Sequence, residues 1–380
     1  MQNKQRSLPR AVSLLLCIVL LLTLFSACGS VPDSTEVTET EADISAQNTD
    51  ESSTPETVTL TDSAGREVVL PAELTCVAPS GPVAQMILLT LAPELLAGLS
   101  DHLTEEKLPW FPNYVADLPV FGQLYSGKSD LNMEALLASD AQAVIDLGDF
   151  KESTAEDMES IEAQTGLPAV FLDASLEALP ETYRTLGRLL NREEQAEKLA
   201  QFVEKTLALT EENAAKIPED ERLTVYYGIG DSGLNCNAAG SVQADVIELI
   251  GAQNAVIPEE INNKSGGTIV SLEELYACEP DVILLGSGGP YDSLTDGEWA
   301  ELQAVRNGSF YEIPDTPYNW MSGPPSVNRV LGIWWLGNLL YPELYDYDIV
   351  AVAQEYYELF LHYDLSTEEA EALLARSTLK

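Results

Sequence analysis

Hydrophobic and polar residues follow the same order in two stretches of the chain, and each stretch predicts a helix followed by a buried strand. The first covers residues 132–147 and the second residues 271–285, and a glutamate opens the helical turn of each, at Glu134 and Glu273. The apolar run that follows is typical of a strand inside a parallel sheet. One alternative is coincidence, because helix-then-strand units are common in α/β chains. The repeat otherwise predicts two similar lobes with a ligand cleft between them.

The rest of the pattern predicts an α/β chain whose two lobes are joined by one long helix. A hairpin is expected over residues 58–70, and the strands that alternate with helices after it indicate parallel sheets covered on both faces. Over residues 192–216 apolar positions recur at helical spacing, after Asn191, a residue type favoured at the N-cap. A helix of that length spans roughly 37 Å. It is long enough to connect two lobes, and a surface helix of one domain is the alternative.

The N-terminus predicts export and lipid attachment. Lys4, Arg6 and Arg10 precede an apolar stretch over residues 11–25, which is short for a transmembrane helix and typical of a signal peptide. Small residues then lead to Cys28, and the segment resembles a bacterial lipobox in which Cys28 is lipidated; Phe25 stands where leucine is usual. A secretory signal with an incidental cysteine is the alternative. The expected location is extracytoplasmic, with a lipid anchor in the bacterial cell membrane.

A polar segment follows the anchor. It contains many Ser, Thr, Asp and Glu residues and lacks the apolar surface needed for a core, so we expect a disordered acidic tether. The expected divisions are a signal peptide at 1–27, the tether at 28–56, an N-terminal lobe at 57–190, a connecting helix at 191–217 and a C-terminal lobe with C-terminal helices at 218–380.

Composition excludes several classes of partner and chemistry. The chain of 380 residues has a net charge of −43, which argues against nucleic acid because no basic surface is available for phosphates. Cys76, Cys236 and Cys278 form neither a disulfide framework nor a metal cluster by spacing, and the two histidines lie far apart. The chain shows no nucleophile elbow, phosphate-binding loop or dinucleotide fingerprint. We therefore expect no cofactor, no directly bound metal and no enzymatic activity.

The predicted ligand site lies on two loops. Tyr318 and Trp320 offer flat surfaces with polar edges, and Arg329 sits in the first turn of an apolar helix, where a cation is favoured only beside an anion. Tyr125 and Lys128 occupy the corresponding loop before Glu134. The alternatives are core aromatics, a surface arginine and a solvated lysine.

These features resemble a known family, the substrate-binding lipoproteins of ABC importers for iron-siderophores, haem, corrinoids and, in some members, molybdate or tungstate. The resemblance covers roughly residues 58–374, and its most specific part is the segment PYNWM…PPSVNRVLGI after residue 316. It implies two Rossmann-like lobes joined by a single long helix. Two departures are Ala141-Gln142, where Pro-Asp is usual, and Ser322-Gly323, where Asp-Arg is frequent.

The resemblance also implies partners. Glu134 and Glu273 would dock on a permease that works with an ATPase, and helix capping is the alternative role for them. The expected function is delivery of an iron chelate by a monomeric, membrane-anchored receptor. Haem, corrinoid, molybdate and tungstate are alternative ligands, and a membrane-anchored extracellular hydrolase is the rival of another class.

Overall fold

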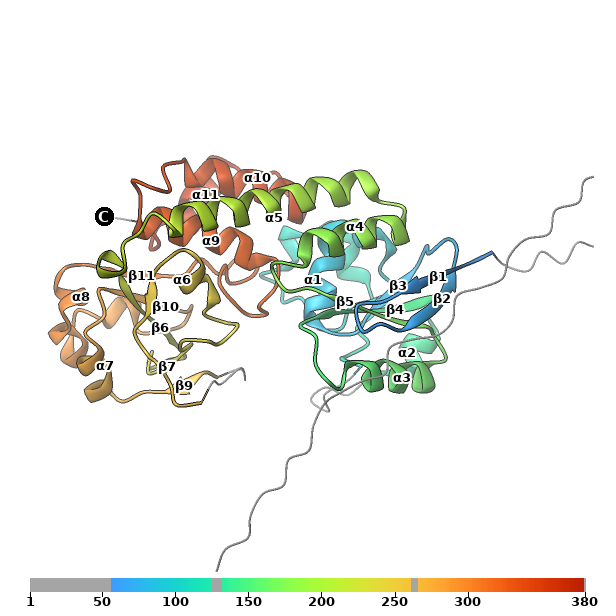
Figure 1. The fold of residues 1–380 in the computed structure, drawn as a ribbon, viewed down its shortest axis with the longest axis horizontal. Helices are drawn as coiled ribbons and strands as arrows, with labels where there is room; N and C mark the ends of the chain where they lie inside the picture. The colour runs from blue at the N-terminus through green and yellow to red at the C-terminus, as the bar shows by residue number, and fades with distance from the viewer. Residues whose placement is uncertain (1–55, 125–131, 261–265, 379–380) are drawn as a thin grey trace, which may run out of the picture. The chain divides into compact units, whose positions relative to one another are not determined.

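The structure is a computed structural model that describes residues 56–124, 132–260 and 266–378 (Figure 1). Its N-terminal lobe contains β1 (Thr57–Thr61), β2 (Glu67–Pro71), β3 (Val77–Pro79), α1 (Pro82–Leu91), α2 (Met133–Leu137), β4 (Ala143–Gly148), α3 (Thr154–Thr165), β5 (Ala169–Asp173) and α4 (Leu179–Leu190). Cys28, Tyr125 and Lys128, together with the expected signal peptide, lie outside the described residues.

The remaining elements follow α4. They are α5 (Glu193–Ala214), β6 (Thr224–Ile229), β7 (Asn235–Cys236), α6 (Asp245–Leu249), β8 (Gln253–Asn254), β9 (Thr268–Ile269), α7 (Leu272–Cys278), β10 (Val282–Leu285), α8 (Gln303–Arg306), β11 (Phe310–Glu312), α9 (Asn328–Leu340), α10 (Ile349–Leu361) and α11 (Thr367–Leu373). Along the part of the chain that the structure describes, no helix is both long and apolar enough to cross a membrane.

Each lobe is built on its own sheet, as the alternating pattern predicts. In the N-terminal lobe β3, β4 and β5 are parallel and adjacent in that order, with Val144 opposite Ala169. In the C-terminal lobe the order is β11-β10-β6-β7-β9, with β10 parallel to both β6 and β11 and with β8 also paired to β6. The central strands are apolar and buried on both faces because helices cover them. The predicted hairpin is also present, as β1 pairs antiparallel with β2.

The long connecting helix is present as α5, with 22 residues. The prediction that Asn191 caps it is wrong, because Asn191 ends the preceding helix, α4, in a left-handed conformation with φ 54°. Helix α4 packs closely along α5 (Figure 1). At Gly187 an added Cβ would lie 2.5 Å from the Cβ of Ala196, so glycine permits this close contact. Gly187 lowers the helix propensity of α4, whereas Pro180 stands in the first turn, where proline is favoured.

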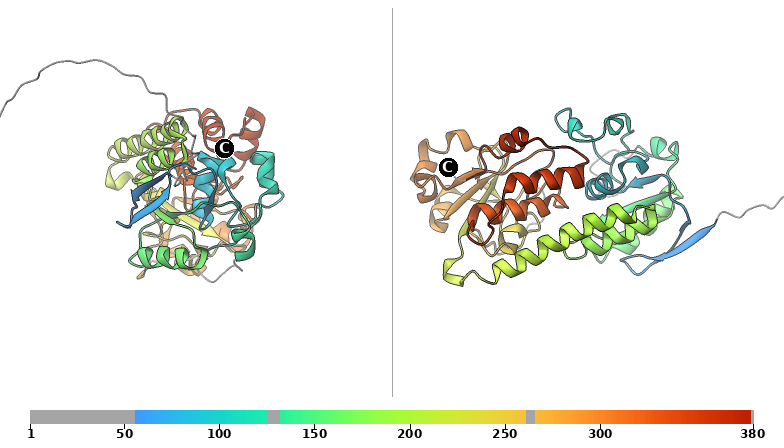
Figure 2. Two further views of the ribbon diagram at one scale, coloured as in Figure 1. Left: turned by 90° about the vertical axis from the view of Figure 1, so that its right-hand side faces the viewer. Right: turned by 90° about the horizontal axis from the view of Figure 1, so that it is seen from above.

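One hydrophobic core joins the two lobes. It includes residues of α1 and α4 in the N-terminal lobe and of α9 and α10 in the C-terminal part, with α5 packed against α9 and α10 (Figure 2). Aromatic rings of the segment before β4 reach across: Trp110 lies 5.6 Å from Tyr357, and Phe111 lies 6.1 Å from Tyr318, both between ring centroids. Aromatic pairs in such edge-to-face geometry stabilise beyond their buried area. The lobes therefore share a packed interface in addition to α5.

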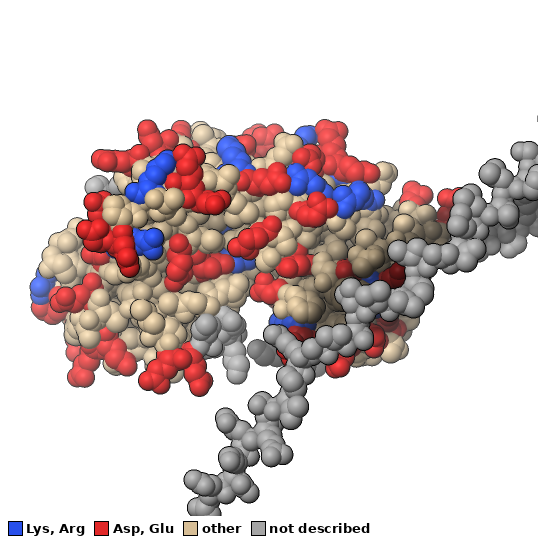
Figure 3. All heavy atoms as spheres, in the orientation of Figure 1, with Lys and Arg blue, Asp and Glu red and all other residues tan. Residues whose placement is uncertain are grey.

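Charges are distributed unevenly over the surface. Acidic side chains cover much of the face in Figure 3, including the region of α7, while many basic side chains gather along α4 and α5. The basic residues of these two helices are engaged in ion pairs with neighbouring glutamates, for example Arg184 with Glu197 at 2.8 Å and Lys198 with Glu194 at 2.8 Å. The face in Figure 3 thus offers acidic rather than basic patches to partners.

Candidate functional site

A pocket of about 230 Å³ lies at the carboxyl ends of β3, β4 and β5, and we call it the acidic pocket. Ligands of open α/β sheets bind at this edge, because the loops that leave the strands converge there. The pocket is lined by Ser80, Gly81, Pro82, Val83, Gln123, Asp146, Leu147, Gly148, Asp149, Lys151, Thr154, Asp157, Phe171, Ala174 and Pro325.

Carboxylates dominate the polar groups of this pocket. Asp146 is buried near the end of β4, and the hydroxyl of Ser80 donates a hydrogen bond of 2.5 Å to it. Asp149 and Asp157 add two carboxylates, against one ammonium from Lys151. The N-terminus of α1, which begins at Pro82 after the N-cap Gly81, also borders the pocket. The three carboxylates favour a ligand that donates hydrogen bonds or carries positive charge, whereas the N-terminus of α1 favours an anionic group at its own end of the pocket.

One lining residue of the acidic pocket, Pro325, comes from the other lobe. Residues 317–327, which we call the cleft-wall loop, lie between β11 and α9, end directly before α9 and bring Pro325 to the acidic pocket. Tyr227 on β6 supports the loop, and its hydroxyl lies 2.9 Å from the Oγ of Ser322. Burial raises the pKa of Tyr227 to about 12, so the phenol keeps its proton at neutral pH.

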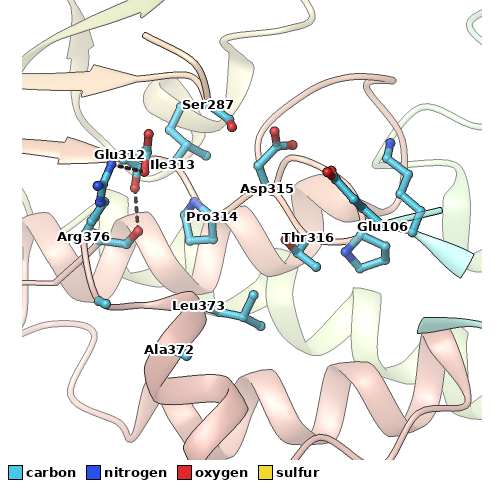
Figure 4. Close-up of a pocket in the computed structure, with 14 residues that line it drawn as sticks. Glu106, Ser287, Glu312, Ile313, Pro314, Asp315, Thr316, Ala372, Leu373 and Arg376 are labelled. Carbon is cyan, nitrogen blue, oxygen red and sulfur yellow. Dashed lines mark hydrogen bonds and ion pairs between the residues drawn. The ribbon is translucent and has the colours of Figure 1, made fainter. Parts of the chain in front are cut away.

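A second pocket, of about 400 Å³, lies where the cleft-wall loop begins (Figure 4). It is lined by residues 312–317, by part of the C-terminal segment, by Ser287 and by Glu106 and Lys107 of the N-terminal lobe. Its arginine, Arg376, already pairs with Glu312 at 3.3 Å and with Asp292 at 2.9 Å. Lys107 lies over the ring of Tyr318, 4.5 Å from the centroid. Neighbouring groups thus engage both cations of this pocket.

The structure brings three of the predicted ligand residues together on the cleft-wall loop and α9, and it buries two of them. Trp320 is 2% exposed and Arg329 is 3% exposed. The guanidinium of Arg329 pairs with the carboxylate of Asp245 on α6, so an internal carboxylate supplies the anion expected at this helix N-terminus. Tyr318 is half-buried between the lobes, beside Phe111 and Lys107.

The two predicted docking glutamates occupy equivalent positions. Glu134 and Glu273 are each the second residue of a helix, α2 and α7, and both are exposed. Asn132 caps α2, whereas Ser271 and Glu274 form a capping box at α7. The carboxylate of Glu274 thus accepts a hydrogen bond from the backbone amide of Ser271 at the start of α7. Glu273 is exposed to solvent. Since other residues do the capping, a surface role for Glu134 and Glu273 stays open.

Sequence reasoning missed the residues of the acidic pocket. Asp146 stands within the apolar run of β4, where a charged residue is unusual. Ser80 and Gly81 form the short turn between β3 and α1. These pocket residues could have been predicted by asking which polar residues stand at or after the end of each predicted parallel strand. Among the residues that the structure describes, no group of three or more His, Cys, Asp or Glu side chains is arranged to hold a metal ion.

Two α/β lobes, a single connecting helix and a pocket at the carboxyl ends of the strands define the class of solute-binding proteins that serve ABC importers. Residues 119–317 match the model of the family described as periplasmic binding protein, and the chain belongs to this family. The family consists of extracytoplasmic binding proteins and not of enzymes, and its members hand a small-molecule solute to a permease and its ATPase.

Similar proteins agree with this assignment. The high-affinity haem uptake system protein IsdE of Staphylococcus aureus is 24% identical over 217 residues, which cover 54% of this chain and 70% of IsdE. An ABC transporter solute-binding protein from Sulfurospirillum deleyianum is 29% identical with a TM-score of 0.76, over 83% of this chain and 99% of that one. The molybdate-binding protein MolA of Haemophilus influenzae shares the fold, with 20% identity and a TM-score of 0.63 over 81% of this chain and 99% of MolA.

Proposed function

We propose that this protein is a lipid-anchored receptor that binds an iron chelate of the siderophore type, or a related metal complex, and delivers it to an ABC permease. The observation that carries the proposal is the acidic pocket at the carboxyl ends of β3, β4 and β5, in a chain of the periplasmic binding protein family. Relatives named for haem uptake and for molybdate binding support a role in metal or chelate import.

The charge of the acidic pocket ranks the ligands. A free oxyanion such as molybdate would meet Asp146, Asp149 and Asp157, with Lys151 and the N-terminus of α1 to compensate. A neutral or cationic chelate can instead donate hydrogen bonds to these carboxylates, and such charge-assisted bonds are the stronger kind. We therefore place an iron chelate first, haem or a corrinoid second and molybdate or tungstate third.

The proposed contacts combine the acidic pocket with the predicted loop residues. Tyr125 and Lys128 remain proposed ligand contacts from the N-terminal lobe, and Tyr318 remains one from the cleft-wall loop. Trp320 and Arg329 have almost no exposed surface, so we now assign them to the support of the loop.

Replacing Asp149 by lysine is expected to weaken binding of a neutral or cationic iron chelate, such as a ferric hydroxamate, about tenfold or more. Losing a charge-assisted hydrogen bond costs about 1.5–3 kcal/mol, and 1.4 kcal/mol corresponds to a factor of ten. Titration calorimetry with a ferric hydroxamate, a ferric catecholate, haem, cyanocobalamin and molybdate would identify the ligand and measure the change.

The control is Asp117→Lys, which makes the same change in net charge at an exposed aspartate outside both pockets. The ligand affinity of this variant should stay within about twofold, because Asp117 does not line the acidic pocket and solvent and salt screen an exposed charge. If Asp149→Lys and Asp117→Lys lost the same amount of affinity, the effect would come from the net charge of the protein and not from the acidic pocket. Tight binding of molybdate alone would reverse the ranking of ligands.

We also propose that Cys28 carries the lipid anchor. Cys28→Ala is expected to leave an unprocessed precursor, since the lipoprotein peptidase cleaves before a lipidated cysteine. Metabolic labelling with a fatty-acid analogue and a mobility shift on gels would show this. Cys17→Ala, within the signal peptide, is the matched control and should be labelled normally. Normal labelling of Cys28→Ala would refute the anchor.

A further inference from the structure

The cleft-wall loop is held by a compact set of hydrogen bonds centred on Asn319. The side-chain Oδ1 of Asn319 accepts hydrogen bonds of 3.0 Å from the backbone amides of Met321 and Ser322. The hydroxyl of Tyr227 donates to the same oxygen at 3.4 Å. An asparagine that bonds its own chain two and three residues on fixes the turn at that point.

Asn328 closes the loop from its other end. Its Oδ1 accepts from the amide of Ser326 at 3.0 Å, and its Nδ2 donates to the carbonyl of Asn319 and, at 3.3 Å, to that of Ser322. Asn328 is 4% exposed. The two asparagines are thus linked to each other, and they determine the backbone course between Asn319 and α9.

We propose that Asn319 and Asn328 are positioning residues, which set ligand affinity by holding the cleft-wall loop and hence Pro325 in the wall of the acidic pocket. Among the described residues that line this pocket neither asparagine appears, whereas Pro325, between them in the sequence, does. A site held in its binding geometry before the ligand arrives avoids the cost of ordering the loop during binding. The inference rests on the proposed function, because it takes the acidic pocket as the ligand site.

The first test requires no ligand. Asn319→Ala removes the acceptor, whereas Asn319→Asp keeps an oxygen at the same place. Amide hydrogen exchange, measured on peptic fragments that contain Met321 and Ser322, should be about tenfold faster in Asn319→Ala, since each lost hydrogen bond contributes to protection. Asn319→Asp should exchange as the wild type does. Unchanged exchange in Asn319→Ala, or equal loosening in both variants, would overturn the positioning role.

The second test separates positioning from general stability. Asn338 lies on the same helix, α9, and its Nδ2 also donates to two backbone carbonyls, those of Tyr345 at 2.8 Å and Tyr347 at 3.2 Å. Asn328→Ala and Asn338→Ala should therefore lower the melting temperature by similar amounts. Only Asn328→Ala should weaken binding of the ferric hydroxamate or ferric catecholate, by about tenfold, with a faster dissociation rate.

Equal affinities in the two variants would overturn the inference. If the wild-type protein bound none of the five probes, the proposed function would fail instead. The exchange measurement on Asn319→Ala and Asn319→Asp would in that case still decide whether the asparagines hold the loop.

Discussion

Reversing the charge of Glu134 and Glu273 together is expected to abolish transport while leaving ligand affinity within about threefold of the wild type. Both glutamates are exposed and stand one residue inside the N-terminus of a helix, one in each lobe. Neither lines the acidic pocket among the residues described. In importers of this class the binding protein docks on a permease, and the resemblance implies that arginines of the permease face these two positions.

Transport should be lost because the substitutions bring like charges together at both contacts between the binding protein and the permease. Glu→Arg replaces two attractive pairs by two repulsive ones, and like charges facing each other across an interface cost several kcal/mol. Uptake of radioactive iron chelate by cells that express the double variant Glu134→Arg/Glu273→Arg is the measurement. Titration of the purified variant reports the affinity independently.

A favourable interaction with the helix dipole is the competing role of the two glutamates, and the chain offers a matched control. Glu368 is the second residue of α11, which like α7 starts with a serine capping box. It is exposed, so Glu368→Arg makes the same change in the helix dipole interaction, worth about 0.3–1 kcal/mol. Transport should survive this substitution. Loss of transport in Glu368→Arg, or a large loss of affinity in the double variant, would contradict docking by Glu134 and Glu273.

The secondary structure was largely predictable because it depends on local periodicity. Helix α5 shows a clear helical period and strand β10 a continuous apolar run, and both are present where the pattern placed them. Helix α4 was missed because its packing against α5 requires glycine at Gly187, a residue that lowers helix propensity. In this case a tertiary contact overrode the local preference, and only the fold reveals such a contact.

The ligand site was harder to predict, because residue type does not reveal which side of a loop faces solvent. Trp320 and Arg329 are typical of binding sites, yet both turn toward the interior. The partner of Arg329 is Asp245, 84 positions away in the sequence, and no local pattern links the two. For Asp146 the difficulty is the opposite one. Its place inside a buried strand suggests a structural residue, although Asp146 itself lines the acidic pocket.

Replacing Arg329 by methionine is expected to destabilise the protein by about 3 kcal/mol, which lowers its melting temperature by roughly 6 °C. Removing one partner of a buried ion pair leaves the other charge uncompensated, at a cost of about 3–5 kcal/mol. We take the lower end because the side chain of Asp245 is 30% exposed. A domain of this size loses roughly 2 °C per kcal/mol. Differential scanning calorimetry measures the shift.

The effect should depend on pH in a defined direction. Burial raises the pKa of Asp245 from 3.8 to about 6, although Arg329 opposes the rise. Without Arg329 the folded-state pKa increases further, so the folded variant binds a proton more strongly than the unfolded chain does. The stability linked to this proton is present below about pH 4 and is lost as the pH rises through the folded-state pKa. The melting temperature of Arg329→Met should therefore fall further below the wild type at pH 8 than at pH 5.

Two further variants decide between a structural role and ligand binding for Arg329. Arg306→Met removes an arginine from an exposed pair with Glu301 and should change the stability by less than about 1 kcal/mol. Arg329→Met combined with Asp245→Leu removes both charges and should recover most of the lost stability, because an apolar pair can replace a buried ion pair. If the double variant regains both stability and affinity, Arg329 acts through the loop. If it regains stability but still fails to bind the ferric chelate, the guanidinium contacts the ligand, as the sequence pattern predicted.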